Sequence, residues 1–260
     1  MSPENVARFE RFRRYPDQVL ERVASAILGF LPSGEKPPTL LELGVGTGAM
    51  ALPLIARGCR YLALDRDPEM LWRFRERVGE REGVEILEAD ARAIPLPHAW
   101  VDGVLVVRFW HLVSEWPRVL AEAIRVLRPG GVLLEGFERI TSPGEESLFQ
   151  VWEAAVRERG GVPARGLHRK RHQEVGRALR ALGLSPKTLL VVRWRETRRA
   201  REFVDLLQER VFHFTHGVPE EAHQMAMERV WAYVESLGGP EAPLPAEKRF
   251  YLRVTRKEGG

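Results

Sequence analysis

The chain has little cysteine and no long apolar run. Cys59 is its one cysteine in 260 residues, which excludes an internal disulfide. No apolar stretch approaches the roughly 20 residues that a membrane helix needs. Residues 1–14 are charged and lack the apolar segment of a signal peptide. We therefore expect a cytoplasmic protein that does not insert into a membrane.

A large excess of charge of one sign is also missing. Lysine and arginine total 40 and aspartate and glutamate total 36, so the formal net charge is only +4. A nucleic-acid-binding surface needs basic residues gathered on one face, so this balance predicts no nucleic-acid partner. A hydrophobic content of 44% and a charged content of 29% are typical of a globular protein. The length suffices for one large domain, or for one domain with a cap.

One stretch near the N-terminus organises the rest of the chain. Thr39–Leu43 is an apolar run, interrupted by Glu42, that predicts a buried strand. Gly44, Gly46 and Gly48 follow, and glycine allows both positive φ angles and the close approach of a ligand. An apolar helix comes next. In an open α/β sheet, such a strand-to-helix turn lies at the carboxyl edge, where these folds bind ligands.

Two classes of ligand fit this turn. Residues 44, 46 and 49 satisfy the loose dinucleotide pattern G-x-G-x-x-G/A. A dinucleotide-binding strand usually has an apolar residue at the position of Glu42, because the pyrophosphate is anionic. A carboxylate beside the glycines suits a cationic ligand instead.

Strands and helices alternate after the turn. Apolar helical faces separate the expected strands, and Arg128–Gly131 ends one of these helices. This alternation predicts an α/β fold with a doubly wound, mostly parallel, seven-stranded sheet. The six strands expected after Thr39–Leu43 are Arg60–Asp65, Val84–Ala89, Val101–Val107, Val132–Phe137, Thr188–Trp194 and Phe250–Thr255.

The string Glu-x-Gly-x-Gly-x-Gly over residues 42–48 resembles motif I of class I S-adenosylmethionine-dependent methyltransferases. The phrase from Ala123 to Leu134, with its Arg-Pro-Gly-Gly stop, resembles the small-molecule branch related to ubiquinone and menaquinone methyltransferases. This similarity covers roughly Leu40 to Phe137. It implies a Rossmann-like methyltransferase fold with S-adenosyl-L-methionine as cofactor. It also implies a small-molecule acceptor.

The resemblance implies a set of cofactor contacts at the ends of successive strands. Glu42 falls near the methionine end of the cofactor, and Asp65 falls where the family binds the ribose hydroxyls. Met70 takes the place of an apolar residue that packs on the adenine. The full set is Glu42, Gly44, Gly46, Gly48, Asp65, Met70, Asp90, Ala91 and Arg108.

Asp90 matches the acid that receives the adenine amino group, with the Ala91 N–H facing a ring nitrogen. The carbonyl of Arg108 is expected to face the cofactor's ammonium. His111 is a weak candidate for a catalytic base, and a structural histidine is the alternative. Trp110 and Tyr15 are candidates for lining the site, with simple packing as the alternative. We expect no metal.

We expect a single methyltransferase domain over residues 1–260. Its core is predicted at 39–137, 184–195 and 248–256, and its cap at 1–31, 141–183 and 196–247. The segment 196–247 carries two helical patterns and more apolar bulk than a solvated loop would have. We therefore expect it to help enclose an acceptor pocket. Its large apolar side chains are Phe203, Phe212, Phe214, Met225, Met227 and Trp231.

Two other functions remain open at this point. One is an NAD(P)-dependent oxidoreductase, against which Glu42 and Asp90 both argue. The other is a non-enzymatic module that binds S-adenosylmethionine, because methyl transfer requires no particular side chain. The acceptor, the atom that is methylated and the oligomeric state are not determined by the sequence.

Overall fold

A computed structural model describes residues 11–12, 14–140, 143–161 and 167–258. The expected cap includes residues 1–10, 13, 141–142 and 162–166, and these lie outside the described residues. The chain divides into two compact units. Unit 1 contains Met1–Arg14, Arg139–Leu167 and Arg193–Arg249, and unit 2 contains Tyr15–Glu138, His168–Val192 and Phe250–Gly260. The predicted division into core and cap stays a prediction.

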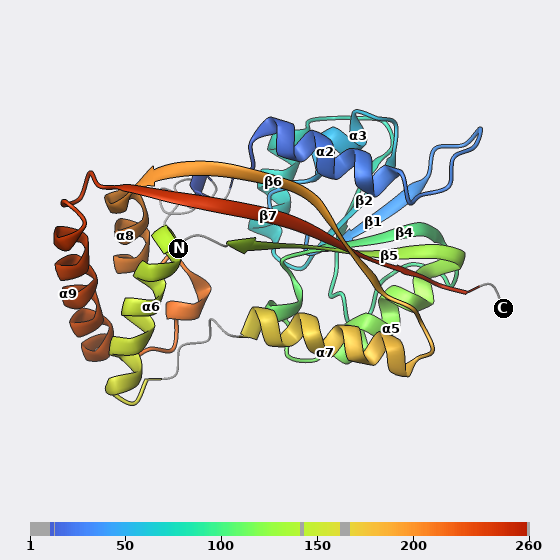
Figure 1. Ribbon diagram of the computed structural model, residues 1–260. Helices are drawn as coiled ribbons and strands as arrows, with labels where there is room; N and C mark the ends of the chain where they lie inside the picture. The colour runs from blue at the N-terminus through green and yellow to red at the C-terminus, as the bar shows by residue number, and fades with distance from the viewer. Residues whose placement is uncertain (1–10, 13, 141–142, 162–166, 259–260) are drawn as a thin grey trace. The chain divides into compact units, whose positions relative to one another are not determined.

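The strands form one seven-stranded sheet with the order β3-β2-β1-β4-β5-β7-β6. The first five strands pair in parallel. Figure 1 shows β6 and β7 running in opposite directions, so the sheet is mixed and not purely parallel. The strands are β1 (Thr39–Leu43), β2 (Arg60–Asp65), β3 (Val84–Glu88), β4 (Val101–Val107), β5 (Leu127–Ile140), β6 (Lys187–Arg199) and β7 (Pro243–Arg256).

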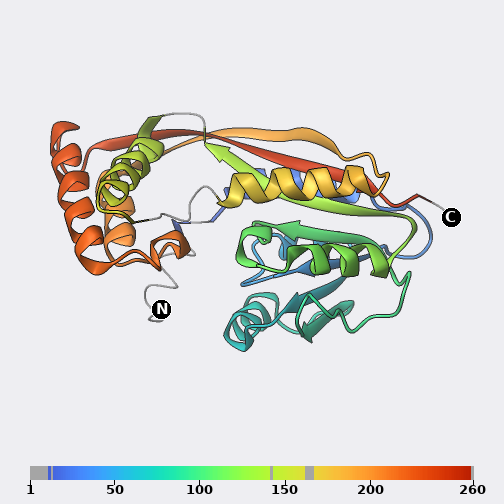
Figure 2. The ribbon, with the colours of Figure 1, turned by 90° about the horizontal axis from the view of Figure 1, so that it is seen from below.

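Helices cover both faces of the sheet in unit 2. Side chains at alternate strand positions, such as Leu41 and Leu62, share a core with α5 and α7, which lie side by side (Figures 1 and 2). The intervening positions face the other way, where Tyr61 stacks on Phe74 of α4. This alternation follows from the two-residue period of a strand. The helices are α2 (Asp17–Leu28), α3 (Ala51–Ile55), α4 (Pro68–Val78), α5 (Trp116–Val126) and α7 (Leu167–Ala181).

Unit 1 has a hydrophobic core of its own. It contains α6 (Pro143–Glu158), α8 (Ala200–Gln208) and α9 (Glu220–Ser236), which Figure 1 shows grouped together. The two helical patterns expected between residues 196 and 247 are thus confirmed as α8 and α9. In the part of the chain that the structure describes, no helix is both long and apolar enough to cross a membrane.

Both β6 and β7 are longer than the sequence patterns indicate. The expected β6 ended at Trp194, but the strand continues to Arg199. The alternation is hidden there because polar residues occupy both faces. The expected β7 began at Phe250, but the strand begins at Pro243. Prolines at 243 and 245 argue against a central strand because they have no N–H to donate.

A buried ionic network joins the last strands to a loop and a helix in unit 2. Glu135 on β5 is fully buried and lies 3.1 Å from the guanidinium of Arg253 on β7. The indole N–H of Trp110 donates to the Glu135 carboxylate at 2.9 Å. His172 on α7 lies 3.8 Å from the same carboxylate. The Glu135 charge is therefore the common partner of three side chains from different elements.

We predict that Glu135→Ala lowers the free energy of unfolding by about 3–5 kcal/mol, because it leaves the Arg253 guanidinium buried without its carboxylate. Urea unfolding measures the change. Glu241→Ala is the matched control, since the Arg199–Glu241 pair has side-chain exposures of 65% and 54%. An exposed pair of this kind contributes about 0–1 kcal/mol. Equal effects of the two substitutions would contradict the structural role of the network.

Candidate functional site

The glycine turn after β1 has the left-handed backbone that its sequence predicts. Gly44, Gly46 and Gly48 have φ angles of 67°, 53° and 76°. The N–H of Gly44 donates to the Leu64 carbonyl of β2 at 2.8 Å, and the Val45 N–H donates to the same oxygen at 3.1 Å. These bonds fix the start of the turn against the neighbouring strand.

The three glycines differ in what surrounds them. A Cβ on Gly44 would come within 2.2 Å of the Phe109 ring, and one on Gly48 within 2.6 Å of the Phe74 ring. An added Cβ on Gly46 would meet nothing within 4 Å. Gly44 and Gly48 therefore allow aromatic rings to pack against the turn, whereas Gly46 borders open space. Gly46 is the position at which a ligand can approach the backbone.

Asp65, at the end of β2, is tied to this turn. Its Oδ2 accepts the Gly46 N–H at 2.9 Å, and its Oδ1 accepts the Asp67 N–H at 3.1 Å. A carboxylate offers about four acceptor positions, so each oxygen can accept one further donor. Two neighbouring hydroxyl groups of a ribose match that capacity. The assignment of Asp65 to the ribose stays a prediction.

Glu42 is 3% exposed on β1 and accepts a hydrogen bond from the hydroxyl of Tyr61 on β2. Burial raises its pKa to about 8, although the Tyr61 hydrogen bond acts in the opposite direction. The negative charge of Asp65 raises the pKa further, and the positive charge of Arg108 lowers it. A carboxyl group in this environment is stabilised as an anion by an added positive charge. A cationic ligand satisfies that requirement.

Arg108 follows β4 and has a φ of 51°, which is uncommon for a residue with a side chain. Its guanidinium lies 3.2 Å from Glu138 and 4.9 Å from the centre of the Tyr15 ring. The Tyr15 hydroxyl donates to Glu138. Burial disfavours the charge of Arg108, but Tyr15, Glu138 and Glu42 outweigh that effect and raise its pKa. Tyr15 thus joins this cluster, and the expected role of the Arg108 carbonyl stays a prediction.

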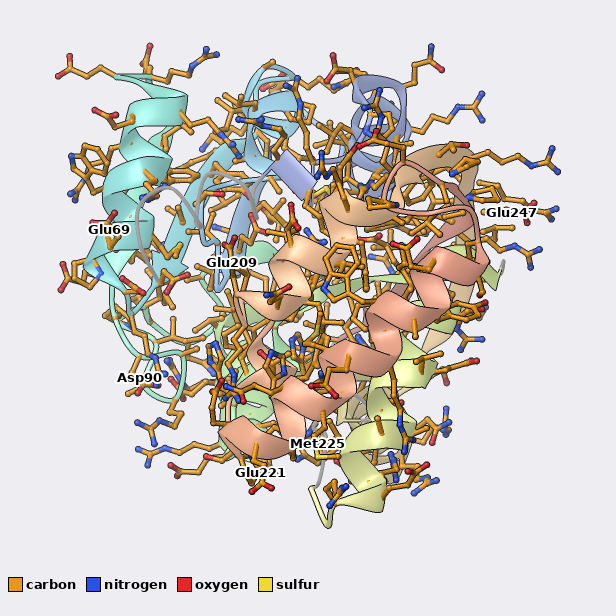
Figure 3. All side chains as sticks on the ribbon, turned by 90° about the vertical axis from the view of Figure 1, so that its left-hand side faces the viewer. Glu69, Asp90, Glu209, Glu221, Met225 and Glu247 are labelled. Carbon is orange, nitrogen blue, oxygen red and sulfur yellow. The ribbon has the colours of Figure 1, made fainter. Side chains whose placement is uncertain are left out.

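Asp90 lies in the loop after β3. Figure 3 labels Asp90, and it also labels Glu69 on the neighbouring helix α4. The Arg92 guanidinium binds its carboxylate side-on, with Nε at 2.9 Å and Nη2 at 2.6 Å from Oδ2. The hydrogen bonds from Arg92 lower the pKa of Asp90 to about 2. Arg92 also pairs with Glu115 before α5. Arg92 is not recognisable as a site residue from the sequence, since a single arginine after an acid carries no distinctive pattern.

The remaining predicted residues lie near the same edge of the sheet. Met70 is half-buried in the first turn of α4, and Ala91 is buried next to Asp90. His111 is half-buried in the short 3-10 helix η1 (Trp110–Leu112), directly after β4. Trp110 is 1% exposed and hydrogen-bonded to Glu135, as a packing residue would be. The catalytic role of His111 stays a prediction.

Parallel pairing explains why these residues gather. The strands β1 to β4 run in the same direction, so the segments after Glu42, Asp65, Glu88 and Val107 all begin at one edge. A turn open at Gly46, a buried acid and a strand-end carboxylate together fit a ligand with positive charge and vicinal hydroxyl groups.

Residues 41–134 match the Methyltransf_11 family, which is described as a methyltransferase domain. The resemblance expected from the sequence is confirmed. The chain is 36% identical over 129 residues to an uncharacterized methyltransferase of Mycobacterium tuberculosis, covering 49% of this chain and 48% of that protein. It is 33% identical over 139 residues to the ubiquinone/menaquinone biosynthesis C-methyltransferase of Methylobacterium nodulans, covering 51% and 55%. The chain spans about half the length of the curated relatives it matches.

The similarity to solved structures extends over more of the chain. The YcgJ protein of Bacillus subtilis superimposes with a TM-score of 0.59 at 16% identity, covering 94% of this chain and 100% of that one. At this identity the likeness shows the fold alone. The likeness and the seven-stranded sheet with helices on both faces are consistent with the Rossmann-like methyltransferase fold expected from the sequence.

We predict that Gly44→Ala lowers the free energy of unfolding more than Gly58→Ala does. Both positions have positive φ angles, 67° and 80°, so both substitutions carry a backbone cost of about 1–2 kcal/mol. Only the Gly44 substitution places a methyl group against Phe109. Overpacking of this kind adds about 1–3 kcal/mol. Urea unfolding of both variants measures the two free energies of unfolding. Equal decreases would show that the Phe109 ring moves aside without loss of stability.

Proposed function

We propose that this protein is an S-adenosylmethionine-dependent methyltransferase that acts on a small molecule. The observation that carries the proposal is the buried Glu42 beside a glycine turn that is open at Gly46. The ammonium and sulfonium of the cofactor supply positive charge at that place. Asp65, which already orders the turn through the Gly46 N–H, supplies acceptors for the ribose hydroxyls.

S-Adenosylmethionine, when bound, supplies a methyl group that its sulfonium already activates for in-line displacement. The protein then has to orient the two reactants and exclude water. Asp65 would hold the ribose, Met70 would pack on the adenine, and Asp90 with Ala91 would bind the adenine edge. His111 stands directly after β4, where it would accept a proton from an acceptor that must lose one. An acceptor that is already nucleophilic needs no such base.

A dinucleotide fits this site less well. Its pyrophosphate would lie against the glycine turn, where Asp65 places negative charge close to the backbone and the buried Glu42 carboxyl offers no positive charge. Two like charges in a partly buried site repel each other strongly. An oxidoreductase function is disfavoured on this ground. A non-enzymatic binding module would have the same cofactor contacts, and transfer of a labelled methyl group distinguishes it from an enzyme.

We also propose that unit 1 is a helical cap that selects the acceptor. The chain passes from unit 2 into unit 1 along β5 and again along β6, and it returns to unit 2 at the start of α7 and along β7. Large apolar side chains of unit 1 form its own core, in which Phe203 and Phe212 are buried and Phe214 is partly buried. Met225 on α9, labelled in Figure 3, is half-buried. The side chains of unit 1 that are not buried in this core would contact the small molecule and determine which acceptor binds.

We expect S-adenosylmethionine and S-adenosylhomocysteine to bind, whereas NADH does not. Asp65→Ala weakens binding of both sulfur compounds, because two hydrogen bonds to the ribose, together about 1–3 kcal/mol, are lost. Isothermal titration calorimetry measures the affinities. Binding of NADH without heat from either sulfur compound would refute the proposed function.

Asp67→Ala is the matched control for Asp65→Ala. The Asp67 carboxylate caps α4 by accepting from the N–H groups of Glu69 and Met70. Its loss costs about 1 kcal/mol of stability, as for other N-caps, and leaves the ribose contact in place. If both aspartate variants bind the cofactor equally well, Asp65 acts only on the turn.

We predict that Phe214→Ala lowers acceptor turnover more than it lowers affinity for S-adenosylhomocysteine. Phe214 is partly buried and packs against Phe149, Trp152 and Phe212 in unit 1. Turnover of an acceptor found by screening with labelled cofactor is compared with calorimetric affinity and melting temperature. A lower melting temperature with unchanged turnover per folded molecule would show that Phe214 only supports the core of unit 1.

A further inference from the structure

A continuous line of contacts connects Glu42 to the glycine turn through side chains that the proposed function does not use. The Tyr61 hydroxyl donates to Glu42. The Tyr61 ring is fully buried and lies parallel to the Phe74 ring, with an interplanar angle of 14° and centroids 6.4 Å apart. Phe74 occupies the space beside Gly48, where no Cβ fits. Tyr61 is therefore held in place by packing on one side while its hydroxyl faces the acid.

The electrostatic surroundings of Glu42 come from the two strands that flank β1. Tyr61 and Asp65 belong to β2, and Arg108 follows β4. The negative charge of Asp65 disfavours ionisation of Glu42, and the positive charge of Arg108 favours it. Arg108 is itself paired with Glu138. Burial raises the pKa of the Tyr61 phenol well above its ordinary value, and Glu42 and Cys59, the residue before β2, act in the same direction. Tyr61 is thus the neutral donor that directly contacts the Glu42 carboxylate.

Burial has a larger effect on Glu42 than the positive charge of Arg108, so the ligand-free acid is more stable when it keeps its proton. A hydrogen bond donated to the carboxylate favours the anion, so the Tyr61 hydroxyl reduces the cost of losing that proton. Arrival of a cation adds a much larger stabilisation of the anion. The site can therefore exist in two charge states, and the ligand selects between them.

We propose that Tyr61 is a positioning residue that allows Glu42 to ionise when a cationic cofactor binds, so that binding releases one proton to solvent. The O–H bond of Glu42 breaks, the proton passes to the buffer, and the resulting carboxylate stays hydrogen-bonded to Tyr61. This inference rests on the proposed function for the identity of the ligand. It makes cofactor affinity tighter as the pH rises towards the pKa of the ligand-free acid.

The first experiment titrates S-adenosylhomocysteine into wild type, Tyr61→Phe and Glu42→Gln between pH 6 and 8, in buffers of different ionisation enthalpy. The ligand's own amine titrates identically in all three proteins, so differences between them belong to the site. We expect wild type to release close to one proton more than Glu42→Gln at pH 7. Its affinity should gain nearly tenfold more per pH unit than that of Glu42→Gln.

Tyr61→Phe keeps the ring on Phe74 and removes only the hydroxyl. We expect it to bind about fivefold more weakly at pH 7, which is the fold-change that corresponds to one lost hydrogen bond. The pH at which its affinity levels off should move upward. Tyr251→Phe is the matched control, because Tyr251 also stacks on a phenylalanine, Phe137, with centroids 5.6 Å apart. Its affinity and pH dependence should equal those of wild type.

The second experiment needs no cofactor. The folded-state pKa of Glu42 lies above its unfolded value, so the acid favours folding at low pH and this contribution is lost as the pH rises towards about 8. The stability of wild type relative to Glu42→Gln should therefore fall steadily between pH 5 and 8. Chemical unfolding of both proteins across this range measures the difference.

The outcomes separate the two claims. If wild type does not bind S-adenosylhomocysteine, the proposed function fails and this inference fails with it. If wild type binds but releases no more protons than Glu42→Gln, only the inference is overturned. Equal affinity and pH dependence of Tyr61→Phe and wild type would leave Glu42 in the site but remove Tyr61 from any positioning role.

Discussion

The backbone at Gly44 is the constraint on which the site depends. Two successive N–H groups, of Gly44 and Val45, converge on one carbonyl of the neighbouring strand, and the chain then turns through positive φ angles. Only a residue without a Cβ permits this turn while Phe109 lies against it. Because the turn is fixed to β2, the Gly46 N–H can donate to Asp65. The acid at the end of β2 thereby becomes part of the turn that follows β1.

Two aromatic rings lie against this turn, one at its first glycine and one at its last. Phe109 comes from the loop after β4 and Phe74 from α4, and each occupies space that a glycine leaves empty. The glycine spacing thus serves two purposes at once. Two glycines admit protein side chains, and the one between them leaves the backbone accessible. A string of three glycines in sequence does not tell which has which role, since that depends on residues 26 and 65 positions away.

Much of the sheet and of the strand-end residues was predictable, because both depend on local patterns. Apolar runs marked β1 to β5, and the acids Glu42, Asp65 and Asp90 stand where those runs end. The partners of these acids were not predictable. Tyr61 lies in an apolar strand, and the sequence does not indicate which group its hydroxyl contacts. No local pattern distinguishes Arg92 from the other arginines of the chain. Contacts between distant elements, such as Glu135 with Arg253, depend on a strand order that no local pattern contains.

The position of β7 bears on how the chain acquires its structure during synthesis. β7 lies between β5 and β6 in the sheet, although it follows both of them in the sequence and is therefore synthesised after them. Until β7 is synthesised, one edge of β5 is unpaired and β6 has no neighbouring strand. The part of unit 1 that follows β6 also lacks the strand that leads back into unit 2. Unpaired strand edges in partly folded chains favour aggregation. The parallel strands β1 to β5 can assemble early, but completion of the sheet waits for β7. Loss of β7 should therefore lower the solubility of the whole chain and not only disturb one strand.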